Sequence, residues 1–345
     1  MNRQLVKYLV WTSFIFTVSL LVVAYIFYRY LNEPDNVRHE QVVVEVLPGT
    51  AFSGIARLLA REGLISRPRW LTLYAVLTGQ AERIQAGEYQ IQPGLSPKQL
   101  LELLVSGKVV QYQVTLVEGW RFDDFLAKLA EQDKLVKKTF SLSPQQIMAE
   151  LGRPEEHPEG RFFPDSYQYV AGTSDLDILK RAYERLEMVL AEEWQNRSDN
   201  LPYETSYEAL IMASIIEKET GLASERGEIA GVFIRRLQRG MRLQTDPTVI
   251  YGLGTNYQGN IKRKHLRQST AYNTYVIKGL PPTPIAMVGR AAIHAALHPQ
   301  PGTSLYFVAR GDGSHFFSDT LEQHQSAVQQ YQIEQRSEQY QSAPK

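Results

Sequence analysis

The stretch at residues 8–28 (YLVWTSFIFTVSLLVVAYIFY) limits how this chain can fold more than any other feature. Its 21 residues include no charged side chain. As an α-helix it would be about 31 Å long, which matches the hydrocarbon core of a bilayer. A cleaved signal peptide is the alternative, but the run is longer than a typical signal core and no small-x-small cleavage site follows it. The sequence therefore predicts a retained membrane-spanning helix.

The charges beside this span predict its orientation. Arg3, Lys7 and the terminal amine precede it, whereas only Arg29 follows closely. Because positive charge stays on the cytosolic side, we expect residues 1–7 in the cytosol and the chain after the span outside it. Aromatic residues at both ends fit the interfacial belts of such a helix: Tyr8, Trp11, Tyr25 and Tyr28.

Composition limits the chemistry available to the rest of the chain. The 345 residues are 43% hydrophobic and 21% charged, which is typical of folded domains. Lysine plus arginine equals aspartate plus glutamate, 37 of each, so a neutral polymer is a better expected partner than nucleic acid. Cysteine is absent, which excludes disulfides, thiolate metal sites and a cysteine nucleophile.

Beyond the span, the hydrophobic pattern predicts an α+β protein that begins with a small module. Residues 29–40 read as a polar linker. Residues 41–111 alternate strand-like segments, glycine turns and amphipathic helices. The expected strands are 41–46, 87–91 and 109–117.

Residues 112–335 predict a larger, mixed α+β domain in which longer helices alternate with aromatic, proline-rich loops. Helices are expected at 178–194, 206–220 and 224–239, the last with Ser224 as its N-cap. Apolar residues go almost all the way round the second of these, so it should be buried. Residues 336–345 are expected to form a flexible tail.

Two carboxylates stand at the end of the buried helix. In SIIEKETG, Glu217 and Glu219 follow an apolar run, and Gly221 ends the helix. Two positions at 100° each separate them by about 200°, so one cleft can use only one of them. The negative end of a helix raises the pKa of a carboxyl, which suits a general acid. A solvated helix end compensated by Lys218 is the structural alternative, and spacing does not choose between the two acids.

Three loops combine polar side chains with aromatic rings. The residues concerned are Gln244, Thr245 and Asp246 in LQTDPT, Asp165 and Tyr167 in PEGRFFPDSYQYV, and Tyr272 and Asn273 in AYNTYVIKGLPPTP. Pro247 favours an extended or turn conformation at Asp246, although an Asx-type turn that caps its own backbone explains that loop equally well. Sugar rings pack on aromatic faces while their hydroxyls need polar partners, so the loops together suit a glycan.

Motifs for metals and nucleotides are weak. His294 and His298 stand four residues apart in HAALH, but the glutamate of a zincin is missing. GLGTNYQG does not match the dinucleotide fingerprint, and Asp312 and His315 show no nucleophile-elbow pattern. We therefore expect neither a metal nor a cofactor.

With these loops in view, the chain resembles the endolytic murein transglycosylase family, also called the YceG-like or MltG family. The matching stretches are EGRFFPDSYQY, ASIIEKETGLASERGEIAGVFIRRLQRGMRLQTDPTVIYGLG, TAYNTYVIKGLPPTPI and LYFVARGDGSHFFSD. The resemblance covers nearly the whole chain. It implies a LysM-like module at 41–111 and a catalytic transglycosylase domain at 112–335. It also implies a single-pass protein of the cell inner (cytoplasmic) membrane, with its catalytic domain on the periplasmic or extracytoplasmic side.

The same resemblance implies an activity. The family are lytic transglycosylases, carbon–oxygen lyases that cut nascent peptidoglycan glycan strands internally and leave a 1,6-anhydro-N-acetylmuramic acid end, which would terminate strand elongation. Its catalytic acid is the first glutamate of the E-K-E triplet, here Glu217. The cleft motifs carry over to Asp165, Tyr167, Gln244, Thr245, Asp246, Tyr272 and Asn273. Peptidoglycan synthases are implied as partners.

Two rival functions stay open. A muramidase-type hydrolase would pair Glu217 with Asp246, because hydrolysis normally needs a second carboxylate. The lyase needs only one acid, since the substrate's own C6 hydroxyl is the nucleophile. The other rival is a non-catalytic, membrane-anchored glycan-binding protein. In each case Glu219 is expected to brace the helix end beside arginine or lysine neighbours.

Overall fold

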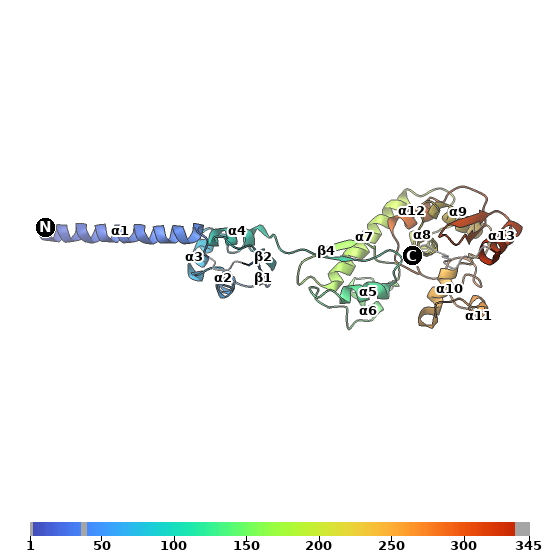
Figure 1. The fold of residues 1–345 in the computed structure, drawn as a ribbon, viewed down its shortest axis with the longest axis horizontal. Helices are drawn as coiled ribbons and strands as arrows, with labels where there is room; N and C mark the ends of the chain where they lie inside the picture. The colour runs from blue at the N-terminus through green and yellow to red at the C-terminus, as the bar shows by residue number, and fades with distance from the viewer. Residues whose placement is uncertain (1–2, 36–39, 335–345) are drawn as a thin grey trace. The chain divides into compact units, whose positions relative to one another are not determined.

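The computed structural model describes residues 3–35 and 40–334, which form two compact units (Figure 1). Unit 1 comprises Met1–Tyr112 and Tyr169–Gly172, and unit 2 comprises Gln113–Gln168 and Thr173–Lys345. Each unit has its own hydrophobic core and mixes helices with short strands, which confirms the α+β class. The tail expected at 336–345 lies outside the described residues.

The expected span is part of one long helix. Helix α1 runs over Arg3–Asn32, and its apolar side chains in the span are mostly exposed. Within the described residues it is the one helix long and apolar enough to cross a membrane, which fits a single-pass anchor. Residues 29–32, expected in the linker, continue the helix because Tyr30 and Leu31 are buried in the core of unit 1. The Tyr30 hydroxyl also donates to the carbonyl oxygen of Arg67 at 2.9 Å.

Unit 1 is built on one antiparallel pair of strands. Its elements are β1 (Val42–Val46), α2 (Phe52–Arg61), α3 (Pro68–Leu77), β2 (Gly87–Ile91) and α4 (Pro97–Ser106). Strands β1 and β2 pair with Val44 opposite Tyr89, which confirms two of the expected strands. Helix α3 escaped the sequence analysis because its apolar residues do not follow one face: Leu71 is buried, whereas Leu77 is exposed.

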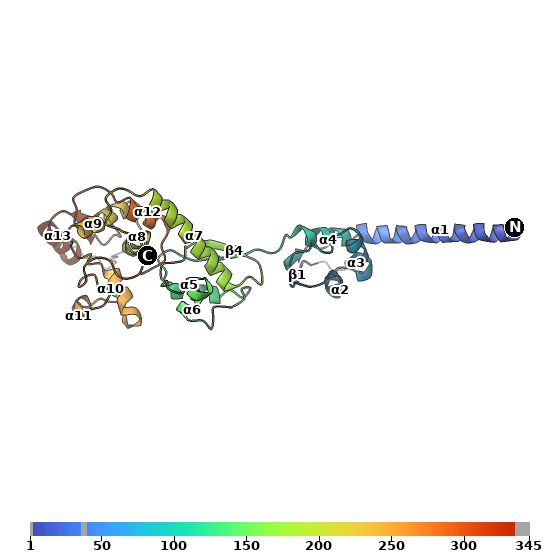
Figure 2. The ribbon, with the colours of Figure 1, turned by 180° about the vertical axis from the view of Figure 1, so that it is seen from behind.

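The first part of unit 2 supports the loops that hold the candidate site. Strand β3 (Tyr112–Thr115) pairs with β4 (Ser166–Tyr169), so the strand expected at 109–117 is shorter than its apolar run. Helices α5 (Phe122–Ala130) and α6 (Pro144–Glu150) lie side by side in both views (Figures 1 and 2). Helix α7 (Asp175–Gln195) follows a capping box between Ser174 and Asp177.

The core of unit 2 surrounds α8 (Ser206–Glu219). Every residue from Ala209 to Ile216 is buried, which confirms the prediction for this helix. Helices α9 (Arg226–Gln238) and α12 (Arg290–Leu297) pack against it (Figure 1). The predicted N-cap Ser224 is wrong. The chain first makes a turn in which Glu225 N donates to Leu222 O at 3.2 Å, so α9 starts two residues later.

The remaining elements complete unit 2. They are α10 (Asp246–Leu253), η1 (Gly254–Asn256), α11 (Arg263–Arg267), β5 (Tyr306–Ala309), β6 (His315–Ser318), α13 (Leu321–Val328) and η2 (Gln329–Glu334). Strands β5 and β6 form an antiparallel hairpin. Asp246 does not adopt the expected extended or turn conformation. It is the first residue of α10, because proline is tolerated in a first helical turn, where its missing N–H has no partner to lose.

Candidate active site

Helix α8 directs its two terminal carboxylates toward different partners. Glu217 Oε2 accepts a hydrogen bond from the backbone N of Gly289 at 3.2 Å. Glu219 Oε1 instead accepts one from the hydroxyl of Thr245. The angular argument from the sequence is thereby confirmed, since the two acids belong to separate clusters.

A second carboxylate, that of Glu118, lies beside Glu217. The segment carrying it is fixed by three hydrogen bonds: Gly119 N to Met287 O at 2.8 Å, Met287 N to Trp120 O at 2.7 Å, and Lys218 Nζ to Gly119 O at 3.0 Å. A Cβ atom placed on Gly289 would overlap the Glu118 carboxylate and lie 2.9 Å from its Oε2. The carboxylates of Glu118 and Glu217 therefore meet at one glycine.

The surroundings of Glu217 favour its protonated form. Burial raises the pKa of Glu217, and the neighbouring charge of Glu118 raises it further. The Gly289 N–H, Arg226 and Lys218 act in the opposite direction, and the net pKa stays above the ordinary value. The side chain is only partly buried, so a carboxyl with a raised pKa stays accessible to a ligand.

Glu219 belongs to a cluster built from the LQTDPT and YNTY motifs. Gln244 N donates to Thr274 O at 3.2 Å, and Thr245 N donates to Thr274 Oγ1 at 3.0 Å. The Tyr275 hydroxyl donates to Asp246 Oδ1 at 2.7 Å. Gln244 adopts a left-handed φ of 54°, which is uncommon outside glycine and which these bonds hold in place. Glu219 thus braces the helix end through a threonine rather than through the expected arginine or lysine.

The stability of unit 2 is expected to fall as the pH rises from about 4.5 to about 7. Burial raises the pKa of Glu219 from 4.5 to about 7, so the folded state holds a proton that the unfolded chain has released across this window. Over this pH window the parent should lose on the order of 3 kcal/mol of unfolding free energy, and Glu219→Gln should remove that loss. Urea unfolding of the detergent-solubilised protein at several pH values measures it. Parallel profiles for the parent and the variant would contradict this assignment.

The other predicted site residues divide into exposed and buried ones. Asp165, Gln244 and Asp246 are exposed. Tyr167 is buried, and its hydroxyl donates to Phe163 O at 2.7 Å. None of the hydrogen bonds among the described residues joins these four side chains to Glu217.

Tyr272 and Asn273 hold neighbouring loops. The Tyr272 hydroxyl lies 2.8 Å from Thr283 Oγ1, and its ring packs on Tyr251 with centroids 4.8 Å apart. Asn273 is buried, and its Nδ2 lies within 3.2 Å of three carbonyl oxygens, those of His265, Leu266 and Gln268.

Glu159 is a buried acid that the sequence analysis missed. Its carboxylate accepts hydrogen bonds from Phe122 N at 3.1 Å and from the Tyr251 hydroxyl at 3.2 Å. Burial raises the pKa of Glu159 from 4.5 to about 7. Glu118 was missed as well, because VEGW reads as a glycine turn before a helix and its contact with Gly289 is long-range.

Comparison with known proteins sets this geometry in a family. The sequence model of the YceG-like family matches residues 44–330, most of the chain. The chain belongs to the YceG-like family. This confirms the resemblance carried by the four matching stretches.

Relatives of this YceG-like chain have been named for an activity. It is 30% identical to the endolytic murein transglycosylase of Bacillus subtilis (strain 168), over 89% of this chain and 90% of that protein. The endolytic murein transglycosylase of Streptococcus pneumoniae serotype 2 is 25% identical over 94% of this chain and 65% of its own length. The crystal structure of a YceG-like protein from Listeria monocytogenes aligns with a TM-score of 0.53 at 29% identity, over 84% of this chain and 99% of that one.

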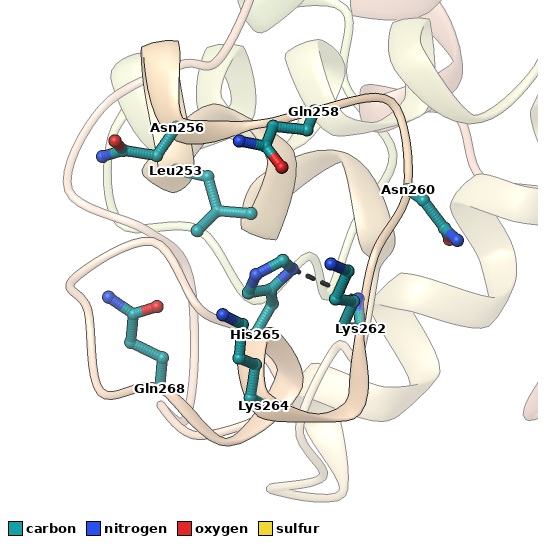
Figure 3. A pocket seen from close by; sticks show the side chains of 8 residues that line it. All are labelled: Leu253, Asn256, Gln258, Asn260, Lys262, Lys264, His265 and Gln268. Atoms are coloured by element: carbon teal, nitrogen blue, oxygen red, sulfur yellow. Dashed lines mark hydrogen bonds between the residues drawn. The ribbon is translucent and has the colours of Figure 1, made fainter.

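This YceG-like chain also has a polar cavity of about 610 Å³ between α10 and α11 (Figure 3). Its lining residues are Leu253, Asn256, Gln258, Asn260, Lys262, Lys264, His265 and Gln268. His265 Nδ1 accepts a hydrogen bond from Lys262 N at 3.2 Å, so Nε2 is the atom of the neutral ring that carries a proton. The lining therefore offers ammonium, imidazole and amide groups, and no carboxylate.

The two histidines of HAALH lie beside an acid from α7. One ligand atom each from Glu193, His294 and His298 can lie within 4.8 Å of one another. The Glu193 carboxylate already pairs with His294 Nδ1 at 2.8 Å and with Arg290 Nε at 2.7 Å. These contacts make the cluster an ion-pair network that joins α7 to α12.

Proposed function

We propose that this chain is an endolytic peptidoglycan lytic transglycosylase that cleaves strands between N-acetylmuramic acid and N-acetylglucosamine. Membership of the YceG-like family and the names of its relatives support the activity. The observation that carries the chemistry is Glu217, whose pKa is raised by burial and by Glu118 at the accessible end of a buried helix. Internal cleavage of a nascent strand would end its elongation.

The reaction needs one acid that acts twice. Protonated Glu217 gives its proton to the glycosidic oxygen, and the bond to C1 of the muramic residue breaks through an oxocarbenium-like transition state. The Glu217 carboxylate then takes the proton of the same sugar's C6 hydroxyl while O6 bonds to C1. Because the nucleophile is already in the substrate, no second carboxylate has to activate water. The products are an anhydro end and a free N-acetylglucosamine hydroxyl, and Glu217 is protonated again.

Glu118 has a supporting role in this scheme. The carboxylate beside Gly289 favours the protonated form of Glu217 before bond cleavage. Arg226 on α9 and Lys218 on α8 face Glu217 as well and oppose that effect. Burial and Glu118 thus raise the pKa of Glu217, and the two cations together with the Gly289 N–H limit that rise.

Glu118→Gln is expected to move the alkaline limb of the activity profile to lower pH. Activity requires protonated Glu217 and falls as the pH rises through its pKa. Removing the Glu118 charge lowers that pKa, so the fall should begin earlier. The kcat/KM profile against pH measures the shift. Glu131→Gln, an exposed change at the C-cap of α5, is the control, and equal profiles for both variants would refute the role of Glu118.

The residues of the cleft motifs are proposed to have two kinds of role. Asp165, Gln244 and Asp246 are exposed and are proposed to contact the glycan directly. The other cleft residues are proposed to shape its walls: Tyr167, Thr245, Tyr272 and Asn273.

Unit 1 is proposed to anchor the enzyme and to hold glycan near it. Helix α1 would cross the inner (cytoplasmic) membrane, with residues 112–335 as a catalytic domain on the extracytoplasmic side. Residues 41–111 are proposed to be a LysM-like module. Their strand–helix–helix–strand order and a cavity of about 840 Å³ along β1 and α2 support this. Anchoring near strand synthesis makes peptidoglycan synthases the proposed partners.

The glycan chain-length distribution tests the proposed activity. Purified sacculi treated with the full-length protein should release strands that shorten progressively through internal cuts. Size separation of the strands after peptide removal measures this. Binding to sacculi without any shortening would instead identify a non-catalytic glycan anchor.

A further inference from the structure

One stretch of unit 2 departs from the balanced charge of the chain. Between Asp246 and Asp312 there is no aspartate or glutamate, although the same stretch contains seven lysines and arginines. The whole chain, in contrast, has 37 residues of each sign. Arg290 pairs with Glu192 and Glu193 on α7, but among the described residues no ion pair involves the other six cations of the stretch, so their charge is available to an anionic ligand.

The cavity between α10 and α11 concentrates that charge on a concave surface. Lys262, Lys264 and His265 line it together with four amide side chains (Figure 3). In the part of the chain that the structure describes, no ion pair involves Lys262 or Lys264. The volume of the cavity, about 610 Å³, falls within the range of ligand-binding sites.

The wall of this cavity is tied to the candidate active site. Buried Asn273 donates to the carbonyl oxygens of His265 and Gln268. The next residue, Thr274, accepts from Thr245 N, and the Thr245 hydroxyl donates to Glu219 in the last turn of α8. A continuous set of short contacts therefore runs from the cavity wall to the helix that carries Glu217, which fixes the cavity relative to the acid.

We propose that this cavity binds carboxylates of the short peptides that branch from the muramic acid residues of the strand. The inference rests on the proposed function, which brings such a strand to Glu217. Muramic acid carries its peptide on the lactyl group, and these peptides expose free carboxylates at intervals along an otherwise uncharged glycan. Lysine and imidazole N–H donors form charge-assisted hydrogen bonds with carboxylates, and amides complete the recognition. The cavity thereby makes the enzyme selective for strands that still bear peptides.

The test compares two substrates that differ only in their peptides. Full-length protein in detergent is assayed on peptide-bearing strands and on the same strands after an amidase has removed the peptides. We expect the parent to prefer peptide-bearing strands by about tenfold in kcat/KM, mainly through KM, since one charge-assisted contact is worth at least that factor. The double variant Lys262→Gln, Lys264→Gln should bring the ratio close to one. Lys278→Gln, an exposed cation of the same stretch outside the cavity, should keep the parent's ratio.

A binding titration separates this proposal from the proposed function. The soluble disaccharide–tetrapeptide fragment should bind the parent protein and bind the double variant about tenfold more weakly. If the parent forms no anhydro ends on either substrate, the proposed function fails. The titration still shows whether the cavity binds the peptide fragment. An unchanged substrate ratio in the double variant overturns the proposal. Binding of inorganic phosphate that depends on the lysines, without binding of the peptide fragment, also overturns it by assigning the cavity to a phosphate ligand.

Discussion

Glu217→Gln is expected to abolish strand cleavage while leaving the protein folded. Glutamine keeps the size of the side chain and still accepts the hydrogen bond from Gly289 N, so packing at the helix end is preserved. It has no acidic proton to give to the glycosidic oxygen and no carboxylate to receive the proton of the C6 hydroxyl. Because one residue performs both transfers, the loss in kcat should be about 10³-fold or more. Release of new strand ends from purified sacculi measures it.

Glu219→Gln is the matched control, since it removes a carboxyl from the same turn of α8. This variant should change the pH dependence of stability yet retain measurable cleavage, because Glu219 faces Thr245 instead of Gly289. Parent-like cleavage by the Glu217 variant together with an inactive Glu219 variant would reverse the assignment of the acid. Circular dichroism of both variants should match the parent.

Gly160→Ala is expected to cost unit 2 about 3 to 5 kcal/mol of unfolding free energy, because two penalties add. Gly160 adopts φ +74°, which an L side chain tolerates poorly. Its new Cβ would also overlap Cβ of Pro284 and lie 2.7 Å from the Cγ of that ring. Pro284 begins the segment that reaches Met287 and Gly289 beside Glu217. Thermal unfolding in detergent should show a fall in Tm on the order of 10 °C.

The chain offers a control that separates the two penalties. Gly152 has almost the same conformation, φ +77°, but a Cβ there would meet nothing within 4 Å. Gly152→Ala should therefore show the backbone cost alone, about 1 to 2 kcal/mol. Equal losses in the two variants would show that the contact between Gly160 and Pro284 contributes little.

Helices with a regular pattern of apolar residues could be predicted from the sequence. The buried helix around Ala209 to Ile216 was evident because apolar residues occupy nearly every position, and α2 and α4 because their apolar residues share one face. The divergence of Glu217 and Glu219 followed from helix geometry alone. Helix α3 was missed, since its apolar residues do not share one face and Leu73, Val76 and Leu77 stay exposed.

The candidate site could be predicted only in part because its contacts are non-local. Glu118 meets Glu217 through the pairing of Trp120 with Met287, and no local pattern predicts that pairing. Thr245 was expected in the cleft, but its partner Glu219 depends on how the loop packs against α8. The prediction for Asp246 was wrong because Pro247 has two possible readings. A proline after an aspartate occurs both in extended loops and in the first turn of a helix, and here it lies in the first turn of α10.

Mass spectrometry of the newly formed strand ends tests the central claim most directly. The rival hydrolase would join Glu217 with Asp246, yet Asp246 accepts from Tyr275 and lies in the cluster of Glu219. If Glu217 acts alone on the substrate's own hydroxyl, every new muramic end should be the 1,6-anhydro form, and the Glu217→Gln protein should produce none. New reducing ends that carry one additional water would contradict the account and show that the enzyme hydrolyses its substrate.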